Sequence, residues 1–486
     1  MLKYSERNGI KDSFSVLHST GYSLIALQQM NLAHKFPISY WNTAVLSVEA
    51  GANEDTETNK NSNYGKVASA IGFMQHECVK VLLPHINKAN FGFTPDPEHN
   101  AIIFGLRGMN GIGDEVARKI IELRPYDSFE HFLQVHQDPE VKSPVKNNHI
   151  VKLIKGGCFD AIENKSREEL METYLELTTD LKTNLTMQNL PALIEHNLIP
   201  EDYNLYVRFY NFRNYIKSFN PVEIIPNNNP KLKKKIDDKL YKLNAISSDF
   251  YLQYFEEDGI IRFDDDDLPI ISIKTFEKNY KKKIEPLDKL VKAQELLPAL
   301  NESLMNIARE KYAEGNISRW EMDSLSFYHN EHELTNLNEE KYGIVNYFDL
   351  PEYDEPIGYN YYKGTQFPKF NIVRLAGTVL DRDKTKHTVS LLTVYGVVNI
   401  KMYAGAFSHY DKQISVDKEN GEGKTVIEKS WFTRGNKIMV AGFRQGNNFK
   451  PKVYKNTIYS HTIALIEDVY EDGRVSLKSE RYYPED

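Results

Sequence analysis

Cysteine is scarce in this sequence, and long apolar runs are missing from it. The two cysteines, Cys78 and Cys158, stand far apart, with no CxxC pair and no histidine at ligand spacing. That spacing excludes a disulfide scaffold and gives no zinc site. No apolar run is long enough to cross a bilayer, and the first fourteen residues lack the apolar segment of a secretory signal. We therefore expect a cytoplasmic protein without a membrane anchor.

Basic residues are in slight deficit. The 486-residue chain carries a formal net charge of −8, which argues against a protein that coats nucleic acid with a globally basic surface. Local basic faces are still compatible with this balance, because only the surface that lines a nucleic acid must be positive. The length leaves room for roughly three or four domains with cores of their own.

The most informative stretch is 105–125, GLRGMNGIGDEVARKIIELRP. Gly111 and Gly113 bracket Ile112, so we expect the backbone to turn tightly there with positive φ and to leave its N–H groups uncovered. Asp114 is expected to cap the helix that follows. The pattern predicts a helix-hairpin-helix, whose glycine turn suits a DNA phosphate approached through the minor groove. An ordinary turn between two packed helices would fit the same glycines.

A second short helix is expected within 147–162, ending at a Gly156-Gly157 turn. Cations accompany both turns, and together with the glycines they form the predicted duplex-binding set. Its members are Arg107, Gly108, Gly111, Gly113, Arg118, Lys119, Lys155 and Gly156.

Four segments in a fixed order carry a family resemblance. The end of the fingers domain is resembled by residues 14–37, and the strand and loop before the tandem helix-hairpin-helix by residues 79–93. The tandem motif itself is resembled by residues 105–162, and the segment that leads into the OB domain by residues 319–334. The family is that of the C-family replicative DNA polymerases of bacteria, represented by the alpha subunit of DNA polymerase III. The resemblance is to the C-terminal portion of such an enzyme, and it fits half of a split gene, the product of an intein-interrupted gene or a phage-encoded variant.

The resemblance implies that His18, Ser19 and Tyr22 lie on the fingers side, near the DNA or the nucleotide. The family pattern has a lysine before this histidine, whereas Val16 and Leu17 stand there in this chain. The missing cation weakens the expectation of a nucleotide contact. A helix-capping or buried structural role for His18 is the alternative.

The middle of the chain has no counterpart in the family. Residues 165–224 show a helical apolar pattern, and residues 51–64 are polar and read as a surface loop. The lysine-rich run at 227–242 fits either a patch that tracks a nucleic-acid backbone or a solvated helix start. A clamp-binding peptide at 294–297 has a glutamine and leucines but no aromatic residue, so a sliding clamp is only a weak candidate partner.

Four consecutive aspartates, Asp264 to Asp267, invite assignment as polymerase carboxylates. Two-metal nucleotidyl transfer needs carboxylates on rigid neighbouring strands, whereas consecutive residues of a strand point to opposite faces. We expect these aspartates to form a hairpin loop between strands at 260–261 and 270–273. The sequence therefore assigns no catalytic residue and no metal ligand.

The last part of the chain changes to an alternating pattern typical of strands. Five strands are expected, with a short helix at 404–410 after the third: 372–379, 388–392, 396–403, 437–444 and 452–459. This order is typical of an OB-fold, a small barrel that binds single-stranded nucleic acid. Arg374, Lys401, Tyr403 and Arg444 are the predicted contacts. Tyr403 could instead fill the barrel core.

The expected architecture is a multidomain α+β chain. Its predicted domains are the end of the fingers (1–65), a tandem helix-hairpin-helix (66–165), a helical variable connecting region (166–365) and a C-terminal OB-fold β-barrel (366–486).

The resemblance implies a role in DNA replication. The chain would grip primer-template DNA, while the palm with its catalytic aspartates and its Mg²⁺ would belong to another chain, leaving no cofactor here. Exposed apolar residues along 24–46 would mark the docking surface for that palm-bearing chain. The alternatives are a non-enzymatic DNA-binding accessory protein and a scaffold that binds no DNA.

Overall fold

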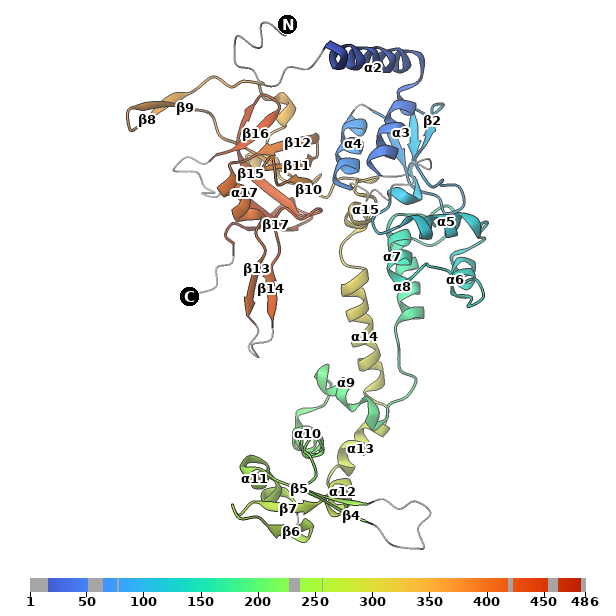
Figure 1. Cartoon of the computed structure of the whole chain (residues 1–486), viewed down its shortest axis with the longest axis vertical. Coiled ribbons are helices and arrows are strands. Elements are labelled where there is room, and N and C mark those ends of the chain that lie inside the picture. The colour runs from blue at the N-terminus through green and yellow to red at the C-terminus, as the bar shows by residue number, and fades with distance from the viewer. Residues whose placement is uncertain are drawn as a thin grey trace. The chain divides into compact units, whose positions relative to one another are not determined.

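Two parts of the chain form separate compact units in the computed structural model (Figure 1). The first unit comprises Met1–Met171 with Gly315–Asp486, and the second comprises Glu172–Glu314. The structure describes residues 16–50, 64–76, 78–226, 237–255, 257–417, 423–452 and 462–481. The domain boundaries expected at 65, 165 and 365 remain predictions. The polar loop at 51–64 lies outside the described residues except at its last position, as does most of the lysine-rich run.

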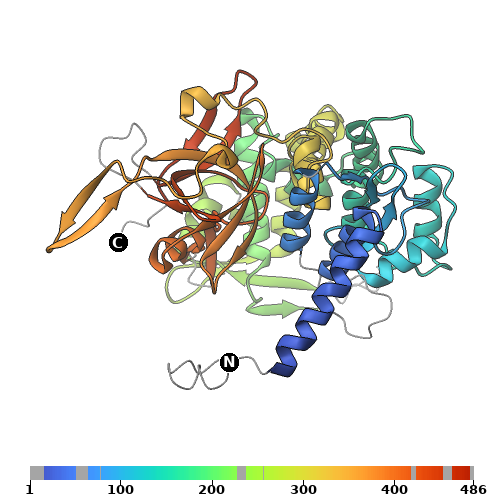
Figure 2. The ribbon, with the colours of Figure 1, turned by 90° about the horizontal axis from the view of Figure 1, so that it is seen from above.

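The first unit begins with three helices, namely α2 (Val16–Lys35), α3 (Ile38–Glu49) and α4 (Tyr64–His76). Pro37 separates α2 from α3 and stands at the N-cap of α3. Figure 2 shows α2 as one straight helix. Leu46 of α3 is fully buried, whereas most large apolar side chains of α2 are at least half exposed.

A small sheet and four helices follow, in which β3 pairs with both β1 and β2. Their bounds are β1 Lys80–Leu82, β2 Thr94–Asp96, β3 Ala101–Ile103, the 3₁₀ turn η1 Leu106–Gly108, α5 Asp114–Glu122, α6 Phe129–Gln137, α7 Asn147–Lys155 and α8 Arg167–Thr178. Aromatic rings fill the core between these helices. Phe132 and Phe159 are fully buried, with ring centroids 5.2 Å apart.

The chain returns to the first unit through α15 (Ile317–Leu325), which Asn316 caps by accepting a hydrogen bond from the backbone of Arg319. Short elements then lead to the barrel: α16 Glu339–Tyr342, η5 Tyr347–Asp349, β8 Gly358–Tyr362 and β9 Thr365–Lys369. Strands β8 and β9 form a separate two-stranded hairpin. Its turn residues Lys363 and Gly364 both have positive φ, the conformation that a tight two-residue hairpin loop requires.

Five strands close into a barrel, because β10 pairs with both β11 and β15. The cyclic order is β10, β11, β12, β16, β15, and β12 runs parallel to β16 while the other neighbours are antiparallel. The bounds are β10 Val373–Asp383, β11 Thr388–Thr393, β12 Gly396–Lys401, α17 Ala404–Asp411, β13 Ile414–Asp417, β14 Lys424–Glu428, β15 Lys437–Gln445, β16 Asn448–Pro451, β17 Ile463–Val469 and β18 Val475–Lys478. The predicted helix after the third strand is therefore confirmed as α17.

The fifth strand differs from the prediction. It is β16, which starts at Asn448 directly after a turn at Gly446, and the predicted strand at 452–459 lies outside the described residues except for its first position. Phe449 of β16 is fully buried in the barrel. A two-residue hairpin turn directly after β15 lets β16 pair with β15 at once. This turn was not recognised in the sequence.

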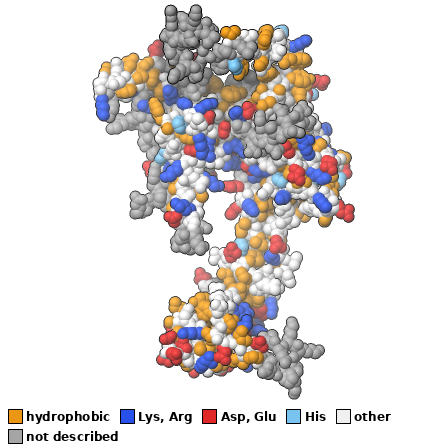
Figure 3. Space-filling model, in the orientation of Figure 1, with side chains coloured by type: hydrophobic (Ala, Val, Ile, Leu, Met, Phe, Trp, Pro, Cys, Tyr) orange, Lys and Arg blue, Asp and Glu red, His pale blue; other side chains and the backbone are white. Residues whose placement is uncertain are grey.

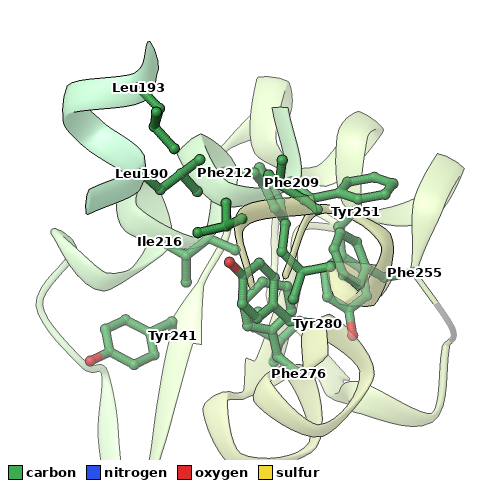
Figure 4. Close-up of a cluster of buried hydrophobic side chains, with 14 of the residues drawn as sticks. Leu190, Leu193, Phe209, Phe212, Ile216, Tyr241, Tyr251, Phe255, Phe276 and Tyr280 are labelled. Atoms are coloured by element: carbon green, nitrogen blue, oxygen red, sulfur yellow. The ribbon is translucent and has the colours of Figure 1, made fainter. Parts of the chain in front are cut away.

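The second unit holds a four-stranded sheet as well as helices, in the strand order β4-β5-β7-β6. Its elements are η2 Met187–Asn189, α9 Leu190–Glu195, η3 Glu201–Tyr203, α10 Asn204–Lys217, β4 Glu223–Ile225, β5 Asp238–Lys242, α11 Ala245–Tyr254, η4 Glu257–Gly259, β6 Ile260–Phe263, β7 Pro269–Ser272, α12 Ile273–Lys283, α13 Glu285–Lys292 and α14 Leu297–Tyr312. Figure 4 shows its aromatic-rich core, in which Phe212, Phe255 and Phe276 lie together.

Candidate nucleic-acid interface

The predicted glycine turn precedes helix α5. Gly111 has φ +84°, a backbone conformation that side chains disfavour. Ile112 is fully buried, which anchors the turn in the core. Gly113 has φ −81° and ψ 172°, so the prediction of positive φ is right for Gly111 and wrong for Gly113. Gly113 is instead the N-cap of α5, and Asp114 is the first helical residue rather than the cap.

The surface in front of this turn is open. A Cβ placed on Gly111 or on Gly113 would meet no atom within 4 Å. The first intrahelical hydrogen bond of α5 runs from Ala117 N–H to Gly113 O at 2.9 Å. The N–H groups of the preceding first-turn residues have no partner within the helix, and Gly113 has no side chain to cap them. Backbone donors at a helix N-terminus attract an anion such as a phosphate.

Charges around the turn are of both signs. The first turn of α5 carries Asp114 and Glu115, and the Arg107 guanidinium pairs with the Asp114 carboxylate. Lys119 pairs with Glu122 at 3.0 Å. Arg118 is exposed, and its guanidinium lies 4.5 Å from the centroid of a neighbouring phenylalanine ring. Among the predicted cations of this motif, Arg118 is therefore the best placed to meet a phosphate.

Two of the predicted glycines serve close packing. A Cβ on Gly108 would lie 2.8 Å from the Phe93 ring, and one on Gly156 would lie 2.6 Å from Cε of Met109. Gly156 N–H already donates to Lys152 O at 2.9 Å. A side chain at either position would collide with the core, so both glycines are required for packing, and their contact with DNA stays a prediction.

Lys155 is likewise directed into the protein. Its side chain is 10% exposed, and Nζ lies 3.4 Å from a carboxylate oxygen of Asp323 on α15. Nζ also lies 5.8 Å from the centroid of the Trp320 ring. Burial lowers the pKa of Lys155, although Asp323 partly offsets that effect. The ammonium group therefore already has a carboxylate partner within the protein, and the Lys155–phosphate contact stays a prediction.

A buried ionic network joins α8 to α15, and the sequence reasoning missed it. Arg167 Nη1 lies 2.9 Å from Glu321 Oε1, and the Glu321 side chain is fully buried. The other Glu321 oxygen accepts 2.9 Å hydrogen bonds from the backbone N–H groups of His329 and Asn330. Arg167 also pairs with Asp160 at 2.7 Å. Partners so far apart in sequence leave no spacing signal that could have revealed them.

The four residues predicted to contact single-stranded DNA differ in their solvent exposure and in their hydrogen-bond partners. Tyr403 is 84% exposed at the N-cap of α17, so it does not fill the barrel core. Arg444 donates to the Leu350 carbonyl at 2.6 Å, and Arg374 donates to the Tyr342 carbonyl at 3.0 Å. Lys401 donates to a backbone carbonyl of the loop after β10. Among the four predicted contacts, Tyr403 is therefore the best placed to meet a base.

The fingers-side residues His18, Ser19 and Tyr22 are exposed on α2. This exposure excludes the alternative of a buried structural histidine at position 18. The apolar residues of the same helix are exposed as well: Leu24, Leu27 and Met30 are 57%, 55% and 69% exposed. The predicted sign of a docking surface is therefore present on α2, whereas Leu46 at the far end of the predicted stretch is buried.

The four aspartates lie in the loop between β6 and β7, as predicted. Asp264 pairs with Lys242 and accepts a 2.8 Å hydrogen bond from the backbone of Leu268. Within the residues that the structure describes, no group of three or more His, Cys, Asp or Glu side chains could hold a metal ion. The described helices also include none with the length and apolar character needed to span a bilayer.

The candidate clamp-binding glutamine is engaged within the second unit. Gln294 Oε1 accepts a 2.6 Å hydrogen bond from the backbone of Leu185, and its Nε2 donates to the Leu185 carbonyl at 2.9 Å. The side chain is held by a backbone loop, so this segment gives no support to a clamp contact.

Comparisons with known proteins agree with this geometry. Residues 78–170 match the helix-hairpin-helix motif family. The chain is 44% identical over 476 residues, 96% of its length, to probable DNA polymerase YorL of Bacillus subtilis strain 168 and to the DNA-directed DNA polymerase of Bacillus phage SPbeta. It is 30% identical over 160 residues to the DNA polymerase III subunit alpha of Aquifex aeolicus, a match covering 32% of this chain and 12% of that protein.

The match covers 35% of the two polymerases from Bacillus subtilis and its phage, so this chain spans about a third of their length. Together with the helix-hairpin-helix and the closed barrel, these similarities confirm the predicted resemblance: the chain is similar to part of the DNA polymerases of Bacillus subtilis and its phage, and part of it is similar to DNA polymerase III subunit alpha.

Proposed function

We propose that this chain is the DNA-binding part of a DNA-directed DNA polymerase similar to the DNA polymerase III alpha subunit, and that the catalytic palm lies on another chain. The observation that carries the proposal is the open helix N-terminus behind Gly111 and Gly113 in a match to the helix-hairpin-helix family. The chain would grip primer-template DNA, and Mg²⁺ would bind to the partner palm.

The duplex grip rests on backbone donors. Phosphate contacts fix the register of a protein on DNA without reading its sequence, which is what a polymerase needs as it moves along any template. Gly111 and Gly113 leave the α5 N-terminus accessible, and the exposed Arg118 lies on the same helix. Together they form one phosphate site.

The barrel would hold the single-stranded template. An exposed tyrosine can stack on any base, a contact worth about 1–3 kcal/mol. Tyr403, at 84% exposure, presents such a ring at the edge of the barrel between β12 and α17. Arg374, Lys401 and Arg444 would support the site by fixing the surrounding backbone rather than by touching DNA.

Helix α2 would dock onto the palm-bearing chain. Its exposed apolar side chains resemble the core of an interface more than a solvated helix surface. They are Val16, Leu24, Ile25, Leu27, Met30 and Leu32, each 50–69% exposed. With Lys35 and His34 confined to its last turn and no acid in its first, this helix is suited to burial against a partner.

A reconstitution experiment tests the proposal. The chain is purified with whatever stoichiometric partner carries polymerase aspartates, and primer extension is measured for each chain alone and for both together. Extension should need both chains. The double variant L27D/M30D should abolish it without changing duplex binding, whereas L252D, which alters a 49% exposed leucine of α11 in the second unit, should have no effect.

A chain that binds primed DNA, has no palm-bearing partner and supports no extension would instead be a non-enzymatic DNA-binding accessory protein. Failure to bind primed DNA at all would refute both assignments.

A further inference from the structure

A cavity of about 690 Å³ opens at one end of the barrel, between the loop that joins β10 to β11 and helix α17. Its walls also include β14 and the segment that follows it. The site residues predicted from the sequence do not line this cavity. The lining residues used below are Arg382, Lys384, His387, Phe407, Lys412 and Lys429.

The charge of this cavity is strongly positive. Four Lys or Arg side chains line it, against the single carboxylate of Asp411. That carboxylate is already used: Oδ1 lies 2.6 Å from Arg382 Nη1, and Oδ2 lies 3.4 Å from Lys384 Nζ. Lys412 and Lys429 make no ion pair with any residue that the structure describes. Within the described part of the chain, the cavity therefore presents two lysines without a paired carboxylate.

Hydrogen bonds hold Arg382 and the β10–β11 loop in place on the cationic side of the cavity. Ser430 Oγ accepts from Arg382 Nη1 at 2.6 Å and donates to Asp411 Oδ1 at 2.8 Å. The β10–β11 loop is ordered by Asp383, whose Oδ1 accepts from the backbone N–H groups of Thr385 and Lys386, each at 2.9 Å. These bonds hold Arg382 and the loop backbone in place, so this wall of the cavity loses little entropy when an anion binds.

One wall of the cavity is aromatic. His387 and Phe407 lie with ring centroids 5.6 Å apart, and Val426 adds an aliphatic surface. The volume lies within the range of about 300–1,000 Å³ that small-molecule and cofactor sites occupy. Phe407 is buried beneath this wall, so the ring open to a base is that of the half-buried His387. Cations beside this ring match the two halves of a nucleotide, since phosphate groups pair with lysines and a base stacks on a ring.

We propose that this cavity binds the phosphate groups of a nucleotide, with Lys412 and Lys429 as the principal cations. The phosphates can belong to a free nucleotide or to a single-stranded DNA segment continuing from Tyr403, which lies just before α17. The second source rests on the proposed function, whereas the first does not. Lys and Arg side chains are visible over the barrel in Figure 3.

Binding to the full chain is measured with three probes: inorganic pyrophosphate, thymidine triphosphate, and a fluorescent oligothymidylate of about 16 nucleotides. The double variant K412A/K429A removes two exposed charges without touching the core. The control K281A/K282A removes the same charge from exposed positions of α12 in the second unit. We expect the first variant to weaken binding about tenfold and the control to leave it unchanged.

The probe that responds identifies the source of the phosphate. Weakened triphosphate and pyrophosphate binding in K412A/K429A supports a free-nucleotide site. Weakened oligothymidylate binding, with a log–log salt slope shallower by about 1.4, which is about 0.7 for each lysine removed, supports a single-strand site. If none of the three probes distinguishes K412A/K429A from K281A/K282A, the proposal is overturned. A chain that binds triphosphate here but no primed DNA would refute the proposed function and leave this site standing.

Discussion

Replacing Gly113 by serine tests the phosphate site directly. Gly113 has φ −81° and ψ 172°, an extended conformation that serine adopts without strain, and a Cβ there meets no atom within 4 Å. Serine is also a better N-cap than glycine, by a few tenths of a kcal/mol. The folded chain should therefore be as stable as the parent or slightly more so.

DNA binding should respond in the opposite direction. A serine Oγ at the N-cap accepts a hydrogen bond from the N–H of Glu115 or Val116, the donors proposed to meet the phosphate. Losing one hydrogen bond to a charged group costs about 1.5–3 kcal/mol, which corresponds to roughly a tenfold to hundredfold loss of affinity. The variant thus separates a binding role of the turn from a structural one.

The assay is fluorescence anisotropy with a labelled primer-template, paired with urea unfolding of the same protein. The matched control is G358S, since Gly358 lies in the β8–β9 hairpin and a Cβ there also meets no atom within 4 Å. If G113S binds primer-template as tightly as G358S while keeping its stability, the turn does not hold a phosphate and the reasoning is refuted.

Three further predictions concern other residues. R118A should weaken duplex binding several-fold at low salt and reduce the log–log salt slope by about one, because it removes one exposed phosphate contact; an unchanged slope would contradict this role. R167M should cost about 3–5 kcal/mol in urea unfolding, because it leaves the fully buried Glu321 carboxylate without its cation; a loss below 1 kcal/mol would contradict the importance of this pair. Burial lowers the pKa of His332 to about 4, and the unfolded chain, with a pKa near 6.5, binds the proton first as the pH falls. The contribution of His332 to the unfolding free energy should therefore decrease by up to about 3 kcal/mol between pH 6.5 and pH 4, and H332Q should remove that part of the pH dependence; an equal pH dependence in H332Q would contradict this role of His332.

The glycine turn shows how far local sequence reasoning reaches. The spacing of Gly111 and Gly113 predicted a hairpin before α5, and the structure has it. The assignment of the cap was one residue off, because Asp114 pairs with Arg107 instead of turning back onto the helix N-terminus. That pairing connects two sides of the turn, so the pattern of α5 alone could not reveal it.

The barrel likewise has parts that the local sequence predicts and parts that it does not. Alternation predicted four of its five strands and the helix α17, because the period of two reports directly which face of a strand is buried. The fifth strand was placed too late because the short β15–β16 turn was not recognised. The closure between β10 and β15 joins the first strand to the fourth, and it follows from the OB-fold order rather than from any local signal.

Features that depend on residues a few positions apart could be predicted from the sequence: the glycine turn, the loop of four aspartates, the apolar residues of α2 and the alternation of the barrel strands. Tertiary structure decided which charged side chains remain open to a ligand. Lys155 forms an ion pair with Asp323, Arg444 donates a hydrogen bond to a backbone carbonyl, and Arg167 forms an ion pair with Glu321. The physical reason is that a buried cation must find a counter-charge or an acceptor, and folding supplies that partner from a distant part of the chain.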